Sequence, residues 1–344
     1  MMVDLDQFKE NFKKVRGKTI AIVYVFEGDN SSGFKHFFMW KSNVLTKWMN
    51  AVQELHCMPL ILDVRTFVDK AINKTLPYID YVLNMNSGTY DLSSLALVPA
   101  TCSSIGVPCI PCNAVSVVTG ESKLLSNLIA NSIGIKVPQV LDSKNENGIF
   151  RPMNLGNSLG VKRGFDCRGN VGIYQEFIEG YDITTPVAYN ALTQKMELLP
   201  TVVFLPHTED TNWFFGEEAK TTQAGYVMRT VCLDKETQNK YIELTETLSI
   251  QSFCRIDARV KCMENGFYHD PINKTVSFDD VYFVEINTMP TIRENNSFCF
   301  SFDAVDPEHI FYSLIKAQEA EMGEININSF LLASSMLSFI KTTH

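Results

Sequence analysis

CRIDARV, at residues 254–260, and VYFVEIN, at residues 281–287, are two short stretches in which polar and apolar residues alternate. Because successive side chains of a β-strand point to opposite faces, each stretch places its polar residues on one face. These polar residues are Arg255, Asp257 and Arg259 in the first stretch, and Glu285 and Asn287 in the second. If the two strands pair antiparallel, Asp257 lies beside Glu285 and Asn287.

Two carboxylates and one amide, without His or Cys, form an oxygen-rich set that suits a hard cation. Mg²⁺ prefers such ligands and usually takes only one or two protein carboxylates together with nucleotide phosphates. We therefore predict that Asp257, Glu285 and Asn287 bind Mg²⁺. The alternative is that they form the solvated face of an antiparallel sheet. Arginines interleaved with carboxylates, followed by an Asn-Thr-Met-Pro turn, favour the metal site.

The composition is that of an ordinary globular protein, with 45% hydrophobic and 20% charged residues in 344. A net charge of -9 argues against nucleic acid or an anionic membrane as a partner. No stretch approaches about 18 uninterrupted apolar residues, so we expect no spanning helix. Nine cysteines without a recognisable signal peptide indicate free thiols in a reducing cytoplasm.

The order of elements indicates an α/β (α+β) protein. Expected strands alternate with helices over the first hundred residues, which predicts a small parallel α/β domain; the strands are at 18–26, 59–64 and 78–85, and the helices at 4–16 and 37–56. A helix at 119–134 follows, capped by Thr119 or Ser122. Its expected apolar face consists of Leu124, Leu125, Leu128 and Ile129.

Strands dominate from residue 148 onward. We expect them at 148–151, 172–177, 183–189, 197–204, 226–232, 254–262 and 281–287, interrupted by a helix at 236–252. Helices at 307–322 and 327–341 end the chain. The last one has too many apolar residues to stand alone, so it packs either on the body of the protein or on a second copy in a homodimer.

The stretch FRPMNLGNSLGVKRG, at residues 150–164, has two functional interpretations. Gly156 to Gly160 reads G-x-S-x-G, the pattern of a serine-hydrolase elbow, but the glycine-rich residues after it do not predict the helix that such an elbow requires. Glycine also lets backbone N–H groups approach phosphate oxygens, and Arg151, Lys162 and Arg163 add positive charge. The alternative to a phosphate-binding loop is a solvated hairpin without a binding role, and the motifs in the rest of the chain distinguish the two.

The order of these motifs resembles the ATP-grasp superfamily and is most similar to the D-alanine–D-alanine ligases. A helical Lys123 and a basic residue on a strand precede the G-x-S-x-G-V loop, and then come YQEFIEGYDIT (174–184), EEAK (217–220), RIDARV (255–260) and VEINTMP (284–290). The resemblance runs from about residue 20 to about 315. It implies ATP between two mixed or antiparallel sheets, and domains at 1–100, 101–185 and 186–344.

The resemblance also implies roles for individual residues. Lys123 and Arg151 would hold the α- and β-phosphates, and the loop containing Gly156, Asn157, Ser158 and Leu159 would close over them. Adenine would contact the hinge residues Gln175, Glu176, Phe177 and Ile178, and Asp182 would bind the ribose. The residues with catalytic roles would be Lys220 at the γ-phosphate, Arg255 at the developing charge, and Ser158. Two magnesium ions are implied, with Mn²⁺ as the alternative.

Departures from the family pattern fall in the amino-acid pocket. Asn157-Ser158 stands where a Ser-Ser pair is common, Thr221 where a tyrosine follows the EAK motif, and Thr291 where a glycine is usual. The residues that the resemblance places at the substrates are Glu27, Arg255, Asn287, Thr291, Arg293, Asn296 and Ser297. The nucleotide motifs are kept while the pocket differs, so we expect a ligase with an altered substrate.

The resulting expectation is an ATP-dependent carboxylate–amine ligase that acts through an acyl phosphate on amino acids or related small metabolites. D-Alanine–D-alanine ligase itself is the nearest alternative. A degenerate ATP-binding sensor or scaffold without turnover is an alternative of a different class. The complete set of Lys220, Arg255, Asp257, Glu285 and Asn287 argues against the last.

Overall fold

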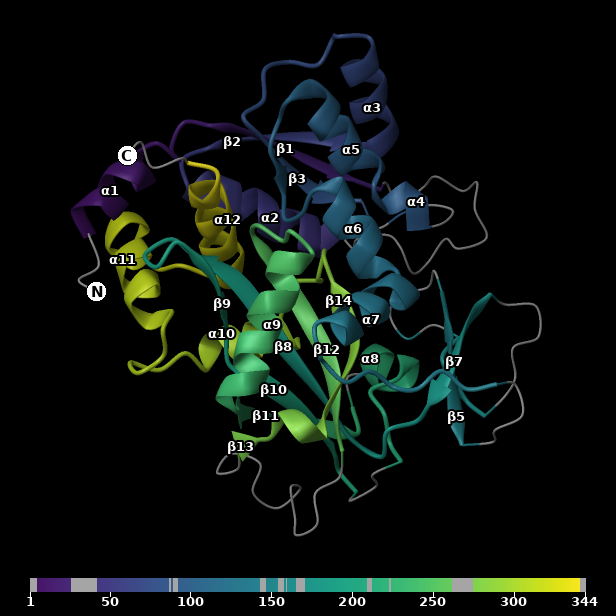
Figure 1. Cartoon of the computed structure of the whole chain (residues 1–344). Coiled ribbons are helices and arrows are strands. Elements are labelled where there is room, and N and C mark those ends of the chain that lie inside the picture. The colour runs from purple at the N-terminus through teal and green to yellow at the C-terminus, as the bar shows by residue number, and fades with distance from the viewer. Residues whose placement is uncertain are drawn as a thin grey trace.

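The structure is a computed structural model, and it describes residues 5–25, 42–86, 88, 92–142, 147–153, 158, 160–164, 171–208, 212–222, 224–261 and 275–340. It contains three β-sheets with helices packed around them (Figure 1). In the described helices, no segment combines the length and the apolar character that crossing a membrane requires.

The first sheet is parallel and has the strand order β2-β1-β3-β4. Its strands are β1 (Thr19–Tyr24), β2 (Met58–Asp63), β3 (Tyr81–Met85) and β4 (Cys109–Ile110). Along β1, Ile20 and Ile22 face a core formed with α2 (Ser42–Glu54), whereas Ala21 and Val23 face α3 (Val64–Ile72) and α5 (Leu97–Ile105). Parallel strands are buried on both faces in this way, and the predicted parallel α/β unit is confirmed.

The second sheet is large, and its spatial order is β13-β11-β10-β8-β12-β14, with β9 paired to β8. Its strands are β8 (Gly180–Asn190), β9 (Lys195–Leu198), β10 (Thr201–Pro206), β11 (Tyr226–Leu233), β12 (Phe253–Lys261), β13 (Thr275–Val276) and β14 (Val281–Asn287). One face packs on α9 (Lys235–Thr247) through Tyr241 and Leu244. Its other face carries the polar residues of β12 and β14.

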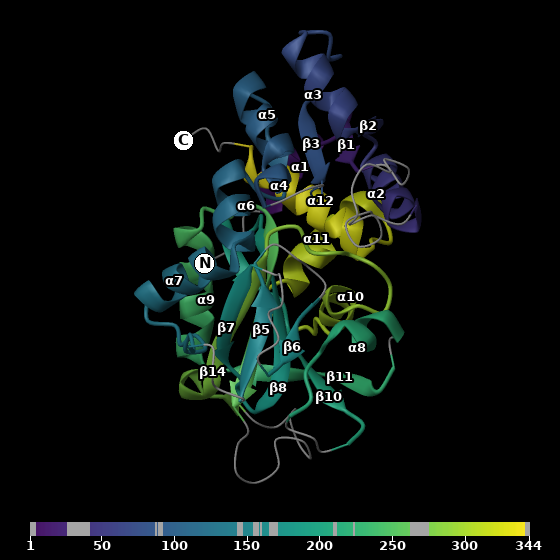
Figure 2. The same cartoon turned by 90° about the vertical axis from the view of Figure 1, so that its right-hand side faces the viewer.

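The third sheet is small and antiparallel, in the order β6-β5-β7. It consists of β5 (Gly148–Pro152), β6 (Lys162–Arg163) and β7 (Gly172–Glu176). This sheet stands at the right of the large sheet in Figure 1, and a view from that side shows it in front of β8 and β14 (Figure 2). The small sheet therefore faces the polar side of the large one.

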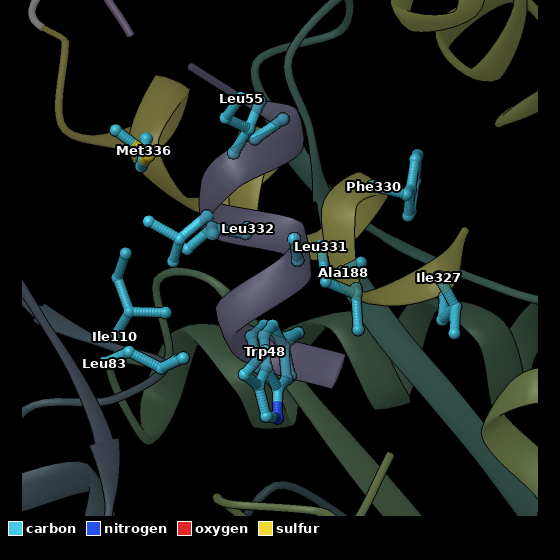
Figure 3. Close-up of a cluster of buried hydrophobic side chains, with 14 of the residues drawn as sticks. Trp48, Leu55, Leu83, Ile110, Ala188, Ile327, Phe330, Leu331, Leu332 and Met336 are labelled. Carbon is cyan, nitrogen blue, oxygen red and sulfur yellow. The ribbon is translucent and has the colours of Figure 1, made fainter. Parts of the chain in front are cut away.

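The last helix lies inside the protein. Figure 3 shows Leu331 and Leu332 of α12 (Ile327–Ser338) packed with Trp48 of α2 and with Ala188 of β8. Phe330 and Met336 are fully buried in the same cluster. Of the two predicted locations, packing on the body of the protein is therefore correct, and α12 supplies no exposed apolar face for a homodimer.

The remaining helices connect the sheets or cover their edges. They are α1 (Leu5–Lys13), α4 (Leu92–Leu95), α6 (Ala114–Glu121), α7 (Lys123–Ser132), α8 (Glu217–Thr222), the 3-10 turn η1 (Phe278–Asp280), α10 (Ser297–Asp303) and α11 (Tyr312–Met322). The predicted strand at 197–204 was wrong, because β9 and β10 divide it. The domain boundaries remain predictions. The first of them, after residue 100, falls between β3 and β4, which pair with each other in one sheet.

The predicted apolar face of α7 was also wrong. Leu124, Leu125 and Leu128 are 41%, 40% and 56% exposed, whereas the buried side chains of this helix are those of Lys123, Ser126, Asn127 and Ala130. Ser122 caps the helix by accepting a hydrogen bond from the Leu125 N–H group at 3.3 Å. The polar stripe turns inward because it lies against β14, where Asn127 Nδ2 donates to the carbonyl oxygen of Val284 at 3.0 Å.

Candidate active site

Strands β12 and β14 pair antiparallel with the predicted register. Asp257 lies opposite Glu285, and Arg255 lies opposite Asn287. The next pair is Ala258 with Phe283, so β14 has one extra residue, Val284, at a β-bulge. The Val284 carbonyl oxygen turns away from the ladder and accepts hydrogen bonds from Arg151 Nη1 and Asn127 Nδ2, both at 3.0 Å.

The Asp257 carboxylate is held by groups from three strands. Arg255 forms a two-pronged contact with it, Nε to Oδ1 at 2.8 Å and Nη2 to Oδ2 at 2.7 Å. Thr184 Oγ1 of β8 donates to Oδ1 at 2.5 Å, and Asn287 Nδ2 donates to Oδ2 at 2.8 Å. These contacts fix the orientation of the carboxylate before any ligand binds.

Glu285 receives its partners from outside the large sheet. Arg151 Nη2 of β5 donates to its Oε2 at 2.8 Å, and Lys123 Nζ lies 3.7 Å from the same oxygen. Burial would raise the pKa of Glu285, but the charges of Lys123, Arg151, Lys220 and Arg255 outweigh burial and lower that pKa to about 2. Glu285 therefore stays ionised, because the positive charges of these four residues stabilise its carboxylate.

The glycine-containing loop reaches α8 at Ser158. Lys220 Nζ donates to Ser158 Oγ at 2.7 Å, and Ser158 Oγ donates to the Phe215 carbonyl oxygen at 3.3 Å. Ser158 has a φ of 59°, in the left-handed region that residues other than glycine rarely adopt. Burial lowers the pKa of Lys220, although Glu285 and Asp257 act in the opposite direction. The two predicted residues therefore meet where the small sheet approaches the large one.

Lys123 and Arg151 both lie at the Glu285 carboxylate, and their predicted role at the phosphates remains a prediction. Lys123 is the first residue of α7, and its side chain is only 8% exposed. Burial lowers the pKa of Lys123, although Glu285 opposes this effect. Arg151 Nη1 also lies 3.3 Å from Gln175 Oε1, and Gln175 Nε2 donates to Asn127 Oδ1 at 3.1 Å. Asn127 therefore connects α7, β7 and β14.

The predicted hinge is anchored by an arginine. Arg259 donates through Nε to the Ile178 carbonyl oxygen, through Nη2 to that of Gly180, and through Nη1 to Asp182 Oδ2, all at 2.7 Å. The Phe215 N–H group also donates to Asp182 Oδ2 at 2.7 Å. Glu176 accepts a hydrogen bond from the Gln139 N–H group at 2.9 Å. The sequence pattern marked Arg259 only as a polar strand residue, so its anchoring role was missed.

The predicted substrate residues after β14 divide into two groups. Arg255 and Asn287 lie at Asp257, whereas Asn296 caps α10 by accepting hydrogen bonds from the Phe298 and Cys299 N–H groups at 3.1 Å. Asn296 Nδ2 also donates to the Thr291 carbonyl oxygen. Ser297 is 5% exposed. Asn296 and Ser297 thus lie at the start of a helix.

The Arg293 backbone also belongs to this turn, because its carbonyl oxygen accepts a hydrogen bond from the Asn296 N–H group at 3.3 Å. The neighbouring Glu294 pairs with Lys47 of α2 at 2.7 Å, which ties the turn to the first sheet unit. Four of the predicted site residues lie outside the described residues; they are Glu27, Gly156, Asn157 and Leu159.

Glu121 is a half-buried acid that sequence reasoning missed. The backbone N–H and the Oγ1 hydroxyl of Thr288 both donate to Glu121 Oε1 at 2.7 Å. Burial raises the pKa of Glu121, although these hydrogen bonds oppose the shift. A Cβ at Gly120 would lie 2.5 Å from Thr288 Cγ2, so glycine is needed for α6 to approach β14. Its position two residues before Lys123 was a sign available in the sequence.

The donor set at Asp257, Glu285 and Asn287 fits a hard cation. The described residues contain no cluster of three or more His, Cys, Asp or Glu side chains that could bind a metal. The residues that could hold such an ion here are Asp257, Glu285 and Asn287 through their side-chain oxygens, with phosphate oxygens to complete the coordination shell. A cavity of about 180 Å³ lies elsewhere, between α1, the β8–β9 turn and the end of α12.

No family model and no curated protein matches the sequence. The structure is similar to the D-alanine–D-alanine ligase of Bacillus anthracis complexed with ATP, with a TM-score of 0.60 and 17% identity over 94% of this chain and 97% of that one.

Two further solved structures agree with that similarity. The D-alanyl-alanine synthetase A of Vibrio cholerae gives a TM-score of 0.60 and 12% identity over 93% of this chain and 98% of that chain. The VanG D-Ala:D-Ser ligase of Enterococcus faecalis gives a TM-score of 0.56 and 12% identity, over 94% of this chain and 99% of that chain. The parallel sheet, the small antiparallel sheet and the large mixed sheet together give this chain the fold of the ATP-grasp ligases.

Proposed function

We propose that this chain is an ATP- and Mg²⁺-dependent carboxylate–amine ligase that forms an amide through an acyl phosphate. Its substrates would be amino acids or related small metabolites. One observation carries the proposal: Lys123, Arg151, Lys220 and Arg255, from different elements, surround Asp257 and Glu285 on the face between two sheets. Such preorganised charge suits a triphosphate and a transferring phosphoryl group.

Each group would have a distinct role in the reaction. A carboxylate oxygen of the first substrate attacks the γ-phosphorus, which gives an acyl phosphate and ADP. Lys123 and Arg151 would hold the α- and β-phosphates, while Lys220 and Ser158 would position the γ-phosphate. A magnesium ion held by Asp257, Glu285 and Asn287 would act as a Lewis acid on the phosphate oxygens.

The second half of the reaction forms the amide. The amine nitrogen attacks the acyl carbon, the tetrahedral intermediate expels phosphate, and the nitrogen releases a proton to solvent. Arg255 would stabilise the negative charge that develops on the oxygen, since its guanidinium is already fixed by Asp257 at 2.7 and 2.8 Å. The protein therefore works mainly by positioning and by electrostatics.

A panel assay tests the proposal. Purified protein is incubated with MgATP and pairs of amino acids, with phosphate release and amide formation followed together, the latter by mass spectrometry. Phosphate release that requires both a carboxylate and an amine substrate supports a ligase. Formation of D-alanyl-D-alanine at a rate above that of all other pairs would identify the nearest alternative. Tight ATP binding without turnover for any pair would instead indicate a nucleotide-binding module.

A further inference from the structure

A short link between two helices contacts the end of strand β14 at two points. Helix α6 ends at Glu121 and α7 begins at Lys123, with one residue between them. Glu121 Oε1 accepts hydrogen bonds from both the N–H group and the Oγ1 hydroxyl of Thr288. At the other end of the link, Lys123 Nζ lies 3.7 Å from Glu285 Oε2. Along the chain, Asn287 therefore lies between the two residues that the link contacts.

Asn287 is the residue whose orientation this link can control. The N–H group of Thr288 and the carbonyl group of Asn287 belong to one planar peptide unit, so holding the N–H group fixes the plane of that unit. The Asn287 side chain donates through Nδ2 to Asp257 Oδ2 at 2.8 Å. Its amide oxygen is thus the end of the side chain that can bind a cation.

Two features stiffen the contact between Glu121 and Thr288. Gly120 lets α6 approach closely, since a Cβ there would lie 2.5 Å from Thr288 Cγ2. The two hydrogen bonds end on one carboxylate oxygen, and hydrogen bonds to a charged acceptor are about twice as strong as those between neutral groups. The exit of β14 is therefore fixed from the side of α6 as well as through its pairing with β12.

We propose that Glu121 is a positioning residue of the cation site: it holds the peptide unit after Asn287 so that the Asn287 amide oxygen can serve as a ligand of Mg²⁺. The proposal rests on the proposed function, because that function requires the metal. In this role Glu121 acts through Thr288 and need not contact the ion. Residues that orient metal ligands typically contribute about 10- to 100-fold to metal affinity.

The test separates metal affinity from stability. Dissociation constants of a non-hydrolysable ATP analogue are measured by calorimetry on the full chain, with excess Mg²⁺ and with a chelator, and their ratio reports the contribution of the metal. The variants are Glu121→Ala, Glu121→Gln and Thr288→Val. Asp234→Ala is the matched control, because Asp234 Oδ1 also accepts from the N–H group and the hydroxyl of one residue, Thr237. That contact lies at the start of α9, on the opposite face of the large sheet.

Glu121→Ala should weaken binding of the analogue with Mg²⁺ by about 10- to 100-fold and leave binding with the chelator unchanged. Glu121→Gln should bind like the unmodified chain, because an amide oxygen can accept the same two hydrogen bonds. Thr288→Val keeps the backbone hydrogen bond and loses that of the hydroxyl, so its effect should be smaller and in the same direction. Asp234→Ala should lose stability in urea without a change in either dissociation constant.

A ratio for Glu121→Ala equal to that of the unmodified chain would overturn the proposal and leave Glu121 a purely structural residue; Thr288→Val decides in the same way if Glu121→Ala does not fold. Equal weakening with Mg²⁺ and with the chelator would also overturn it, since Glu121 would then act on the nucleotide and not on the metal. Failure of Glu121→Gln to restore binding would show that the charge matters and the hydrogen bonds do not. If the unmodified chain binds the analogue no better with Mg²⁺ than with the chelator, the proposed function fails together with the proposal.

Discussion

Asp257 and Glu285 are cross-strand neighbours on β12 and β14, and each is held by cations from a different direction. Asp257 is gripped by Arg255 within its own strand, whereas Glu285 binds Arg151 from the small sheet and lies near Lys123 of α7. The pair therefore connects the rigid large sheet with the sheet that faces it. Its chemical role can be tested separately from its structural role.

Replacing Asp257 by Asn should lower turnover by at least about 100-fold in the panel assay, because one ligand of the predicted metal loses its charge. The neutral amide keeps the shape of the side chain, so circular dichroism should be unchanged. Asp279→Asn is the control, since Asp279 is exposed and pairs with Lys136 at 2.9 Å. Turnover by Asp257→Asn equal to that of the control would contradict the metal assignment.

Glu285 predicts a pH dependence of stability. Its pKa of about 2 in the folded protein lies below the ordinary glutamate pKa of 4.5. The stabilisation is therefore fully present above about pH 4.5 and is lost as the pH falls toward 2. The free energy of unfolding in the presence of a chelator should decrease by about 2–3 kcal/mol from this group across that range.

Urea unfolding at several pH values measures the effect. Glu285→Gln should show a shallower loss of stability below pH 4.5 than the unmodified chain, whatever its stability at neutral pH. Glu217→Gln, at an exposed position, should retain the full slope. Identical slopes for Glu285→Gln and the unmodified chain would refute the low pKa.

Gly120 and Thr288 predict a steric coupling. Gly120→Ala should destabilise the chain by about 1–3 kcal/mol, because the added Cβ would lie 2.5 Å from Thr288 Cγ2 and would push α6 from β14. Thr288→Ser removes that methyl group but keeps the hydroxyl that donates to Glu121. The double variant should therefore be more stable than the sum of the single effects, as a double-mutant cycle in urea would reveal. Simple additivity would mean that the two positions do not touch.

In helix α7, we expect a buried polar residue to contribute more to stability than an exposed leucine. Asn127→Ala should cost about 1–3 kcal/mol of unfolding free energy, because it removes one of the two hydrogen bonds donated by the buried Gln175 Nε2, the one at 3.1 Å, together with the bond from Asn127 to the Val284 carbonyl oxygen. Leu128→Gln should change that free energy by no more than about 0.5 kcal/mol, because Leu128 is 56% exposed. Chemical denaturation measures both, and a larger loss for Leu128→Gln would restore the apolar face that the sequence pattern suggested.

The faces and the pairing of β12 and β14 could be predicted from the sequence. The period of two is a property of the extended backbone, so alternation in CRIDARV assigns Asp257 and Arg259 to one face without further information. The structure buries Ile256, Ala258 and Val260 on the other face, as expected. The neighbouring residues also predicted Ser122 as one of two possible N-caps, and the structure confirms Ser122 as the cap, with Lys123 as the first residue of the helix.

What the tertiary structure decided was the partner of each face. A helix with a leucine stripe and a polar stripe can bury either, and the hydrogen bond from Asn127 to Val284 selected the polar one in α7. Asn296 became a helix cap, and α12 was enclosed between α2 and β8. The sequence by itself determined which side chains share a face, because that follows from neighbouring residues. Which charges and surfaces meet depended on segments far apart in the chain, such as Asn127 and Val284 at 157 positions from each other, and only packing brings these together.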